Sequence, residues 1–244
     1  QFHSAFPSIV KKEDGEFLLA FRRAPDRKIF GEGHSNHVDP NSYLVMMCSK
    51  DGVNWDQEPE LLYAHAFGGS QDPCLLLLKN GNLICTSYGW AFVRPDGLPN
   101  LKTPNFQNRD GVVFLGGYVL YSGDGGKQWT GPVYPPHIRP EINYSAMGNP
   151  IPAYNRGALW EGKDGRINWV VAASDSETPR KTSTHLIVSE DGGKNWEYSA
   201  PVAVLDTASF NETSIYETPA GDLVAFLRTS RLNGEAWIAR SKDG

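Results

Sequence analysis

The sequence of 244 residues has little cysteine or methionine, three of each, and no apolar run long enough to span a bilayer. A transmembrane helix needs about 20 consecutive apolar residues, so no membrane-spanning segment is expected. The 23 basic and 28 acidic residues nearly balance, and the basic residues form no block. Nucleic acid is therefore not an expected partner. The six His and three Cys show no metal-ligand spacing, so no metal site is expected.

The three cysteines are Cys48, Cys74 and Cys85, and two of them lie within apolar, strand-like runs. Such a placement is typical of buried thiols. A disulfide between Cys74 and Cys85 is an alternative that the pattern does not indicate. The sequence opens at Gln1 on a strand-like stretch, without a start Met or a signal peptide. We therefore expect the first residues of the natural protein to be missing.

A repeated phrase dominates what the sequence does contain. Ser-Glu-Asp-Gly-Gly-Lys-Asn-Trp at 189–196 matches Ser-Gly-Asp-Gly-Gly-Lys-Gln-Trp at 122–129, and a shorter variant, Ser-Lys-Asp-Gly-Val-Asn-Trp, stands at 49–55. The last four residues, Ser-Lys-Asp-Gly at 241–244, look like the start of another copy. Self-similarity of this kind is the signature of a repeat architecture.

The phrase predicts a tight turn between two strands. Its Asp accepts hydrogen bonds from the backbone amides just ahead of it, its Gly residues supply positive φ, and its Trp anchors the next strand in an apolar layer. Alternating or apolar runs at 43–48, 118–121 and 185–188 precede the three copies. Such runs are typical of strands that enter a hairpin.

The pattern Ser-x-Asp-x-Gly-x-x-Trp resembles the Asp-box, or BNR repeat, of the sialidase (neuraminidase) superfamily and of other β-propellers. The resemblance implies a β-propeller fold. It also implies that the box is a structural element that lies away from the active-site face, so its Asp residues are not expected to be catalytic.

Four segments, at 6–22, 72–85, 148–171 and 212–228, share a second pattern of an apolar strand, a turn with Gly and another apolar strand. A loop, a third strand and a turn with the repeated phrase follow, which makes a four-stranded blade. We expect an all-β fold, a six-bladed β-propeller of four-stranded antiparallel blades that is partial in this chain. Residues 1–244 would form a single sialidase-like propeller domain, truncated at both ends, because an open propeller edge would expose unpaired strand amides.

The starts of the four segments should converge, because the first strand of every propeller blade begins at the same mouth of the channel. Aligning the segments on Pro7, Pro73 and Thr213 places Phe6, Asp72 and Glu212 at one level. The second strands of two blades return to this mouth, and they end at Arg22 and Arg228. Carboxylates and arginines together are typical of a site for an anionic or hydroxylated ligand.

The stretch Asn-Glu-Thr-Ser-Ile at 211–215, with Gly221 and Arg228 after it, resembles a sialidase segment in which an Arg follows a Glu by sixteen residues. The resemblance implies that Glu212 polarises a Tyr nucleophile and that Arg228 grips the carboxylate of sialic acid. The Tyr would lie beyond Gly244. The alternative is that Glu212 and Arg228 form an ordinary ion pair at two strand ends.

The family's acid/base Asp lies in a loop of the first blade shortly before the first box, which corresponds to residues 28–43. Asp39 is the best match for this catalytic role, with Glu32 and His37 as rivals. A general acid would need a raised pKa in a partly dry pocket, and an Asp before Pro is otherwise a common turn former. Asp72, also followed by Pro, resembles the family Asp that faces the sugar; the alternative is a cap on the strand start.

One departure from the family pattern concerns the carboxylate grip. Family members carry an Arg two residues before the Pro of the first segment, where this chain has Ala5. One of three carboxylate-binding arginines is therefore missing, unless Arg22 or Arg23 reaches into the site. The family's third Arg would lie beyond Gly244.

The resemblance implies an exo-α-sialidase-like glycoside hydrolase of carbohydrate metabolism. It would remove terminal sialic acid from glycans with retention, through a tyrosyl intermediate and without a metal or organic cofactor. We expect sialylated or other glycans as partners and a secreted or periplasmic location. The alternatives are a propeller glycosidase for a different terminal sugar and a non-catalytic propeller that binds glycans.

Overall fold

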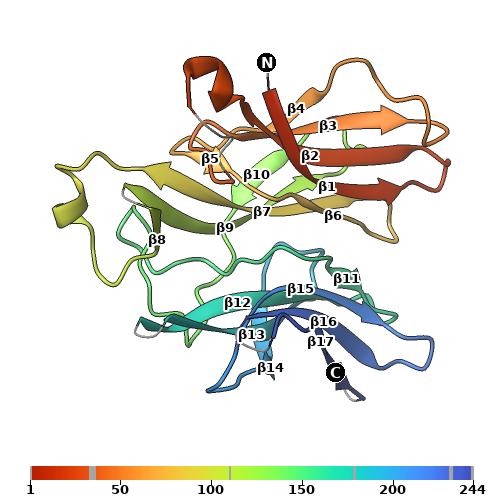
Figure 1. The fold of residues 1–244 in the computed structure, drawn as a ribbon. Coiled ribbons are helices and arrows are strands. Elements are labelled where there is room, and N and C mark those ends of the chain that lie inside the picture. Colours follow the sequence, from red (N-terminus) through yellow and green to blue (C-terminus); the bar gives the residue numbers. More distant parts are fainter. Residues whose placement is uncertain (1, 33–36, 110, 178–179, 231–232, 243–244) are drawn as a thin grey trace.

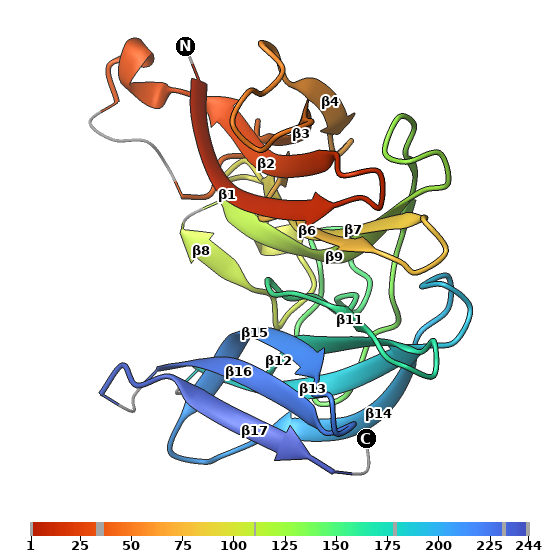
Figure 2. The ribbon, with the colours of Figure 1, turned by 90° about the vertical axis from the view of Figure 1, so that its right-hand side faces the viewer.

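The computed structural model describes residues 2–32, 37–109, 111–177, 180–230 and 233–242. It consists of four antiparallel sheets that are arranged as the blades of a β-propeller (Figure 1). Figure 2 shows the blades following one another through the molecule, from β1 near one end to β17 near the other. The all-β, antiparallel fold expected from the sequence is confirmed, with four blades in the described part of the chain. A total of six blades stays a prediction.

The blades follow the order of the sequence. Blade 1 contains β1 (Phe2–Lys11), β2 (Phe17–Pro25), β3 (Tyr43–Ser49) and β4 (Glu60–Tyr63). Blade 2 contains β5 (Gly69–Ser70), β6 (Cys74–Leu77), β7 (Leu83–Phe92), β8 (Gln107–Arg109), β9 (Val112–Ser122) and β10 (Thr130–Val133). Blade 3 contains β11 (Trp160–Glu161), β12 (Ile167–Glu177), β13 (Arg180–Ser189) and β14 (Glu197–Ala203). Blade 4 contains β15 (Ser209–Glu217), β16 (Leu223–Ser230) and β17 (Trp237–Ser241). Two short 3-10 helices, η1 (Arg27–Phe30) and η2 (Leu98–Asn100), lie in the connections.

The core lies between neighbouring blades. The middle strands β7, β9, β12 and β13 bury side chains on both faces, because each blade is covered by the next on either side. Between blades 2 and 3, the rings of Trp169 and Trp196 meet edge to face with centroids 5.5 Å apart and pack beside Ile84 and Ile187. Burial of large aromatic side chains contributes about 2–3 kcal/mol each, so these contacts hold adjacent blades together.

The repeated phrases form the tight turns that their residues predict. In the third copy, Oδ1 of Asp191 accepts hydrogen bonds from the backbone N–H groups of Lys194 (3.0 Å) and Asn195 (2.9 Å) and from the hydroxyl of Ser189 (2.9 Å). The copies at Asp51 and Asp124 make equivalent bonds. The register places these turns at the hairpin end of the blades, because Ser49 pairs with Phe17 while Phe2 and Pro25 pair at the other end. Of the incomplete copy at 241–244, residues 243 and 244 lie outside the described residues.

The third blade differs from its predicted form. The sequence predicted an apolar inner strand at the start of the segment 148–171, but the inner edge consists of an isolated bridge between Tyr154 and Ala172 and of the two-residue strand β11. The segment between them bends toward blade 4, where the N–H of Thr213 donates to the carbonyl of Arg156 at 3.1 Å. Satisfying backbone groups across the blade interface thus replaces regular pairing within the blade.

All three cysteines are free thiols, with Cys74 and Cys85 buried, as the apolar runs around them predict. Among the described residues no helix is long and apolar enough to cross a membrane.

Candidate functional site

Irregularities in the inner strands bring four side chains together at one end of the propeller. The register shifts between Ala5 and Ser8 in β1 and between Phe210 and Thr213 in β15, and the inner edge of blade 2 breaks between β5 and β6. Bulges of this kind bend a strand and re-aim its side chains. The four residues, here called the mouth ring, are Phe6, Asp72, Arg156 and Glu212.

Arg156 lies at the centre of the mouth ring. Its Nε is 3.8 Å from Oδ2 of Asp72, its Nη1 is 4.0 Å from Oε2 of Glu212, and its guanidinium carbon lies 4.8 Å from the ring centroid of Phe6. The prediction that Phe6, Asp72 and Glu212 share one level is therefore confirmed by a common neighbour. Arg156 was not among the predicted residues, because the alignment on Pro7, Pro73 and Thr213 did not include the third segment, at 148–171.

Close packing of the backbone fixes the position of Arg156. A Cβ at Gly157, which has φ +152°, would lie 1.8 Å from the carbonyl oxygen of Thr213. Asn155 donates through Nδ2 to the carbonyls of Val170 (2.8 Å) and Asn211 (3.1 Å), so it links blades 3 and 4. The Arg-Gly pair after an Asn is the local signal that could have identified this residue, because only Gly permits such an approach of two backbones.

Asp72 lies beneath the mouth and does not face an open pocket. Its side chain is 1% exposed, and its Oδ2 accepts a hydrogen bond of 2.6 Å from the hydroxyl of Tyr88. Burial and the negative charge of Asp72 raise the pKa of Tyr88 well above its ordinary value. Asp72 therefore supports Arg156 and Tyr88 from below, and the contact with substrate predicted for it would require movement of these neighbours.

The two arginines of β2 point to opposite faces of their strand. Arg22 is fully buried and lies below Phe6, with its guanidinium carbon 5.9 Å from the ring centroid. Burial lowers the pKa of Arg22, while the charges of Asp39 and Asp72 oppose that shift. Arg23 stacks 3.9 Å from the ring centroid of Phe2. In the register of β1 and β2, Arg22 lies directly opposite Ala5, so its buried side chain is on the same side of the sheet as Ala5, and Arg23 is on the other side. A role of Arg22 in place of the missing arginine stays a prediction.

Asp39 lies on the blade 1 side and is held in an ion pair. Its carboxylate, 1% exposed, accepts hydrogen bonds from Nε (2.7 Å) and Nη2 (3.0 Å) of Arg27 and from the N–H of Asn41 (2.8 Å). Burial disfavours the charged form, but these hydrogen bonds outweigh it and lower the pKa of Asp39. The raised pKa expected of a general acid is thus not found. Of the two rivals, Glu32 lies 3.8 Å from Arg27, and the exposed His37 packs edge to face on Phe6 at 4.9 Å.

Glu212 and Arg228 meet as the sequence predicts. Nη1 of Arg228 lies 3.2 Å from Oε1 of Glu212, and the two side chains are 63% and 35% exposed. The half-buried carboxylate is therefore accessible and lies between two guanidinium groups, those of Arg156 and Arg228. This contact fits both the catalytic role and the ordinary ion pair that the sequence left open.

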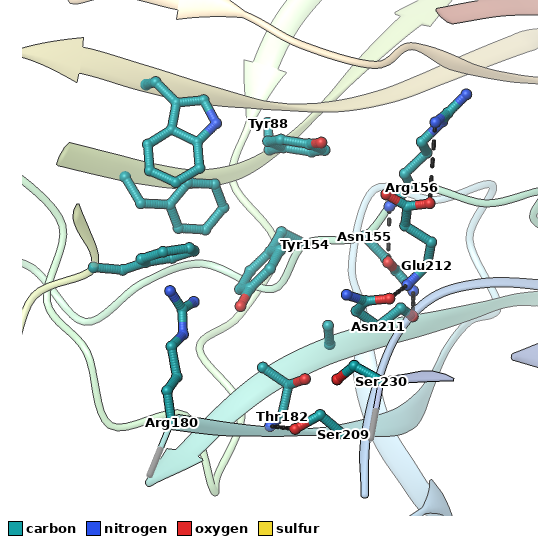
Figure 3. A pocket seen from close by; sticks show the side chains of 14 residues that line it. Tyr88, Tyr154, Asn155, Arg156, Arg180, Thr182, Ser209, Asn211, Glu212 and Ser230 are labelled. Atoms are coloured by element: carbon teal, nitrogen blue, oxygen red, sulfur yellow. Dashed lines mark hydrogen bonds and ion pairs between the residues drawn. The ribbon is translucent and has the colours of Figure 1, made fainter. Parts of the chain in front are cut away.

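A cavity of about 350 Å³, here called the main cavity, opens beside Arg156 and Glu212 (Figure 3). Blades 2, 3 and 4 contribute its walls. Aromatic rings line one part of it, from Tyr88, Trp90, Phe106, Phe114 and Tyr154. Polar and charged side chains line the rest, from Asn155, Arg156, Arg180, Thr182, Ser209, Asn211, Glu212 and Ser230. An apolar wall with a few converging polar groups is typical of a site for a small organic ligand.

The charges in the main cavity favour an anionic, hydroxylated ligand. Arg156 and Arg180 line opposite sides of it, and Glu212 is its carboxylate (Figure 3). Hydroxyls and amides of the remaining lining residues can donate to or accept from sugar hydroxyls. Within the described ranges no group of three or more His, Cys, Asp and Glu side chains is placed to bind a metal ion.

Comparisons with known proteins agree with this architecture. The chain is 67% identical to a protein of unknown function from Dyadobacter fermentans DSM 18053, with a TM-score of 0.98 over 100% of this chain and 66% of that one. It thus spans just under two thirds of that protein. The Hadza microbial sialidase Hz136 has a TM-score of 0.69 at 15% identity, over 98% of this chain and 44% of that one. Zg3597, a family 117 glycoside hydrolase from the marine bacterium Zobellia galactanivorans, has a TM-score of 0.64 at 15% identity, over 100% of this chain and 67% of that one.

The chain shares the β-propeller fold of these proteins. No protein-family model and no curated protein matches it. At 15% identity the two glycosidases show the fold and leave the chemistry of the site to be argued from its own residues.

Proposed function

We propose that the protein is a propeller glycoside hydrolase and that it releases a terminal acidic sugar, with sialic acid as the first candidate, at the main cavity. The observation that carries the proposal is the position of Glu212. Its accessible carboxylate lies between Arg156 and Arg228 at one end of a cavity with an aromatic wall. Sugars stack on aromatic rings and form hydrogen bonds with the groups around them, and the two structural neighbours named above are glycosidases.

The arginines suit recognition of a carboxylate on the sugar. Arg156 faces the main cavity from blade 3, and Arg228 extends from β16 at the side of Glu212. Guanidinium groups bind carboxylates through charge-assisted hydrogen bonds of about 1.5–3 kcal/mol each. Arg156 thus supplies a cation at the mouth although Ala5 stands where the sialidase pattern has an arginine. This favours an acidic sugar over a neutral one.

The nucleophile in this proposal is a Tyr outside the described chain, polarised by Glu212. A carboxylate beside the anomeric carbon would repel an anionic nucleophile, whereas a neutral phenol that hands its proton to a neighbouring Glu would not be repelled. The phenol oxygen attacks the anomeric carbon and the leaving group departs. Water then cleaves the tyrosyl intermediate, which gives retention.

Protonation of the leaving group requires an acid on the blade 1 side. Asp39 serves only if its pair with Arg27 opens when substrate binds, since that pair lowers its pKa. His37, exposed against Phe6, can reach the mouth without that change. Separate substitutions of Asp39 and His37 distinguish the two candidates. The variant that lacks the true general acid should still cleave substrates whose leaving group needs no protonation, and should lose activity on the others.

The first test uses the full-length protein with an aryl α-sialoside and with the matching aryl glucuronide. Glu212→Gln should lower kcat by about 10²–10⁴-fold while leaving the melting temperature nearly unchanged, because a general base is lost from an accessible position. Glu190→Gln, on an exposed turn at the opposite end of the blades, is the control and should keep full activity. Turnover that survives Glu212→Gln would contradict the role of Glu212. A folded protein that binds acidic glycans without cleaving any of them would favour the glycan-binding propeller.

A further inference from the structure

A second cavity, here called the outer cavity, adjoins the main cavity on the side away from Glu212. It has a volume of about 270 Å³, and Phe106 and Arg180 line both cavities. The guanidinium carbon of Arg180 lies 3.0 Å from the ring centroid of Phe106, so the two side chains form a shared wall. Figure 3 shows Arg180 across the main cavity from Arg156 and Glu212.

The lining of the outer cavity is polar and nearly balanced in charge. Carboxamides of Gln107 and Asn143 and the hydroxyl of Ser176 line it, together with the carboxylate of Glu177. With the guanidinium of Arg180 the charges cancel, in contrast to the two guanidinium groups and one carboxylate of the main cavity. Amides and hydroxyls both donate and accept hydrogen bonds, as sugar hydroxyls do. The lining therefore suits a neutral, hydroxyl-rich group.

A buried network holds this wall in place. Glu141, 6% exposed, accepts hydrogen bonds from the N–H (2.8 Å) and Nδ2 (2.7 Å) of Asn143 and from the N–H of Ser174 (2.8 Å). It thereby ties the loop before blade 3 to strand β12. The hydroxyl of Tyr154, a residue of the main cavity, lies 3.4 Å from the same carboxylate. One carboxylate thus supports the walls of both cavities, and preorganised walls of this kind lower the cost of binding.

From these observations we infer that the outer cavity is a second subsite, which binds a neutral sugar ring attached to the acidic sugar in the main cavity, on the side away from the cleaved bond. The inference rests on the proposed function. The reacting carbon must lie near Glu212 and Arg156, so a unit that passes Arg180 lies beyond the far end of the bound acidic sugar. The outer cavity is of similar size to the main cavity, which fits a second ring better than a short side chain. The substrate is then a glycan whose acidic sugar carries a neutral cap, so the unit released is a capped acidic disaccharide and the acidic sugar is no longer the terminal residue.

The experiment compares three probes for sialic acid and for glucuronic acid with the full-length protein. The first is the aryl glycoside, the second is the same glycoside with glucose attached at the far end of the acidic sugar, and the third is the acidic sugar linked to lactose through the bond to be cleaved. Turnover and the dissociation constant are both measured. Gln107→Ala is the test variant, because Gln107 is exposed at the edge of blade 2. Gln128→Ala, an exposed Gln at the opposite end of that blade, is the matched control.

We expect the glucose-capped probe of at least one acidic sugar to bind about tenfold more tightly than the uncapped one, a difference of about 1.4 kcal/mol. Gln107→Ala should remove that advantage and leave the uncapped probe within twofold, and Gln128→Ala should change neither. The same pattern of binding without any turnover would support the subsite and contradict the proposed hydrolysis. Equal affinity for capped and uncapped probes overturns the subsite, whatever the turnover. If Gln107→Ala affects only the lactose-linked probe, the subsite is not on the side away from the cleaved bond, and its proposed placement is overturned. If no probe binds, both proposals are overturned.

Discussion

Nε of Arg156 lies 3.8 Å from Oδ2 of Asp72, although the two residues belong to different blades and are 84 positions apart in the sequence (156 − 72). Asp72 is buried and Arg156 is about one third exposed, so the carboxylate holds the guanidinium at the border between the core and the main cavity. Pairing a buried carboxylate with a half-exposed arginine orients the arginine toward a ligand. The arrangement of the mouth ring therefore depends on Arg156, a residue that the sequence did not identify.

Arg156→Ala should weaken binding of acidic glycans by about 10–100-fold, the value of one or two lost charge-assisted hydrogen bonds. It should also lower the free energy of unfolding by about 1–2 kcal/mol, because Asp72 loses its charged partner in a partly solvated setting. Arg156→Lys keeps the charge but loses the planar guanidinium, so its affinity and stability should lie between those of the parent and those of Arg156→Ala. Titration calorimetry and urea unfolding measure these effects. Unchanged affinity for acidic sugars in Arg156→Ala would exclude the proposed carboxylate contact.

Gly157→Ala should disrupt the site through the backbone. The added Cβ would lie 1.8 Å from the carbonyl oxygen of Thr213, so the segment that carries Arg156 must move away from blade 4. We expect a loss of at least about 3 kcal/mol of stability, together with the loss of ligand binding. Gly165→Ala is the matched control, because its φ of +86° is also unfavourable for Ala but no atom lies near the new Cβ. It should cost about 1 kcal/mol and leave binding intact. Similar effects of the two substitutions would contradict the close approach of blades 3 and 4.

The turns of the repeated phrase should make stability depend on acidic pH. Hydrogen bonds from the backbone N–H of Asn195 and its neighbours lower the pKa of Asp191 to about 2, and equivalent bonds lower the pKa of Asp51 and Asp124. A carboxylate with a lowered pKa in the folded state stabilises the protein above its unfolded value of about 3.9, and this stabilisation is lost as the pH falls from about 4 toward 2.

Melting curves between pH 7 and pH 2 should therefore show a smaller acid-induced decrease in the melting temperature of Asp191→Asn than in that of the parent. At neutral pH the variant should melt at a lower temperature, because its amide accepts the N–H bonds less strongly. Asp96→Asn, in an exposed loop, is the control and should follow the parent curve. A variant curve parallel to that of the parent over the whole range would contradict the stabilising role of the charged Asp191.

The candidate site was only partly accessible to sequence reasoning. Aligning the strand starts predicts that Phe6, Asp72 and Glu212 converge, because every blade repeats the same local geometry. It also predicts that Glu212 lies near Arg228. That alignment does not predict the burial of Arg22 or the opposite direction of Arg23. Nor does it predict the pairing of Asp39 with Arg27. They depend on which side chains the neighbouring blade covers.

The local elements and their repetition follow from the order of the amino acids in the sequence. Its Asp and Gly residues specify the turns, and its alternating apolar runs specify the strands, through hydrogen bonds and backbone preferences that act within a few residues. The local pattern does not specify that Arg156 enters the mouth ring, that Asp72 lies beneath it or that the main and outer cavities share one wall. These features arise from contacts between blades, where packing and backbone satisfaction across the interface override the regular pattern within each blade.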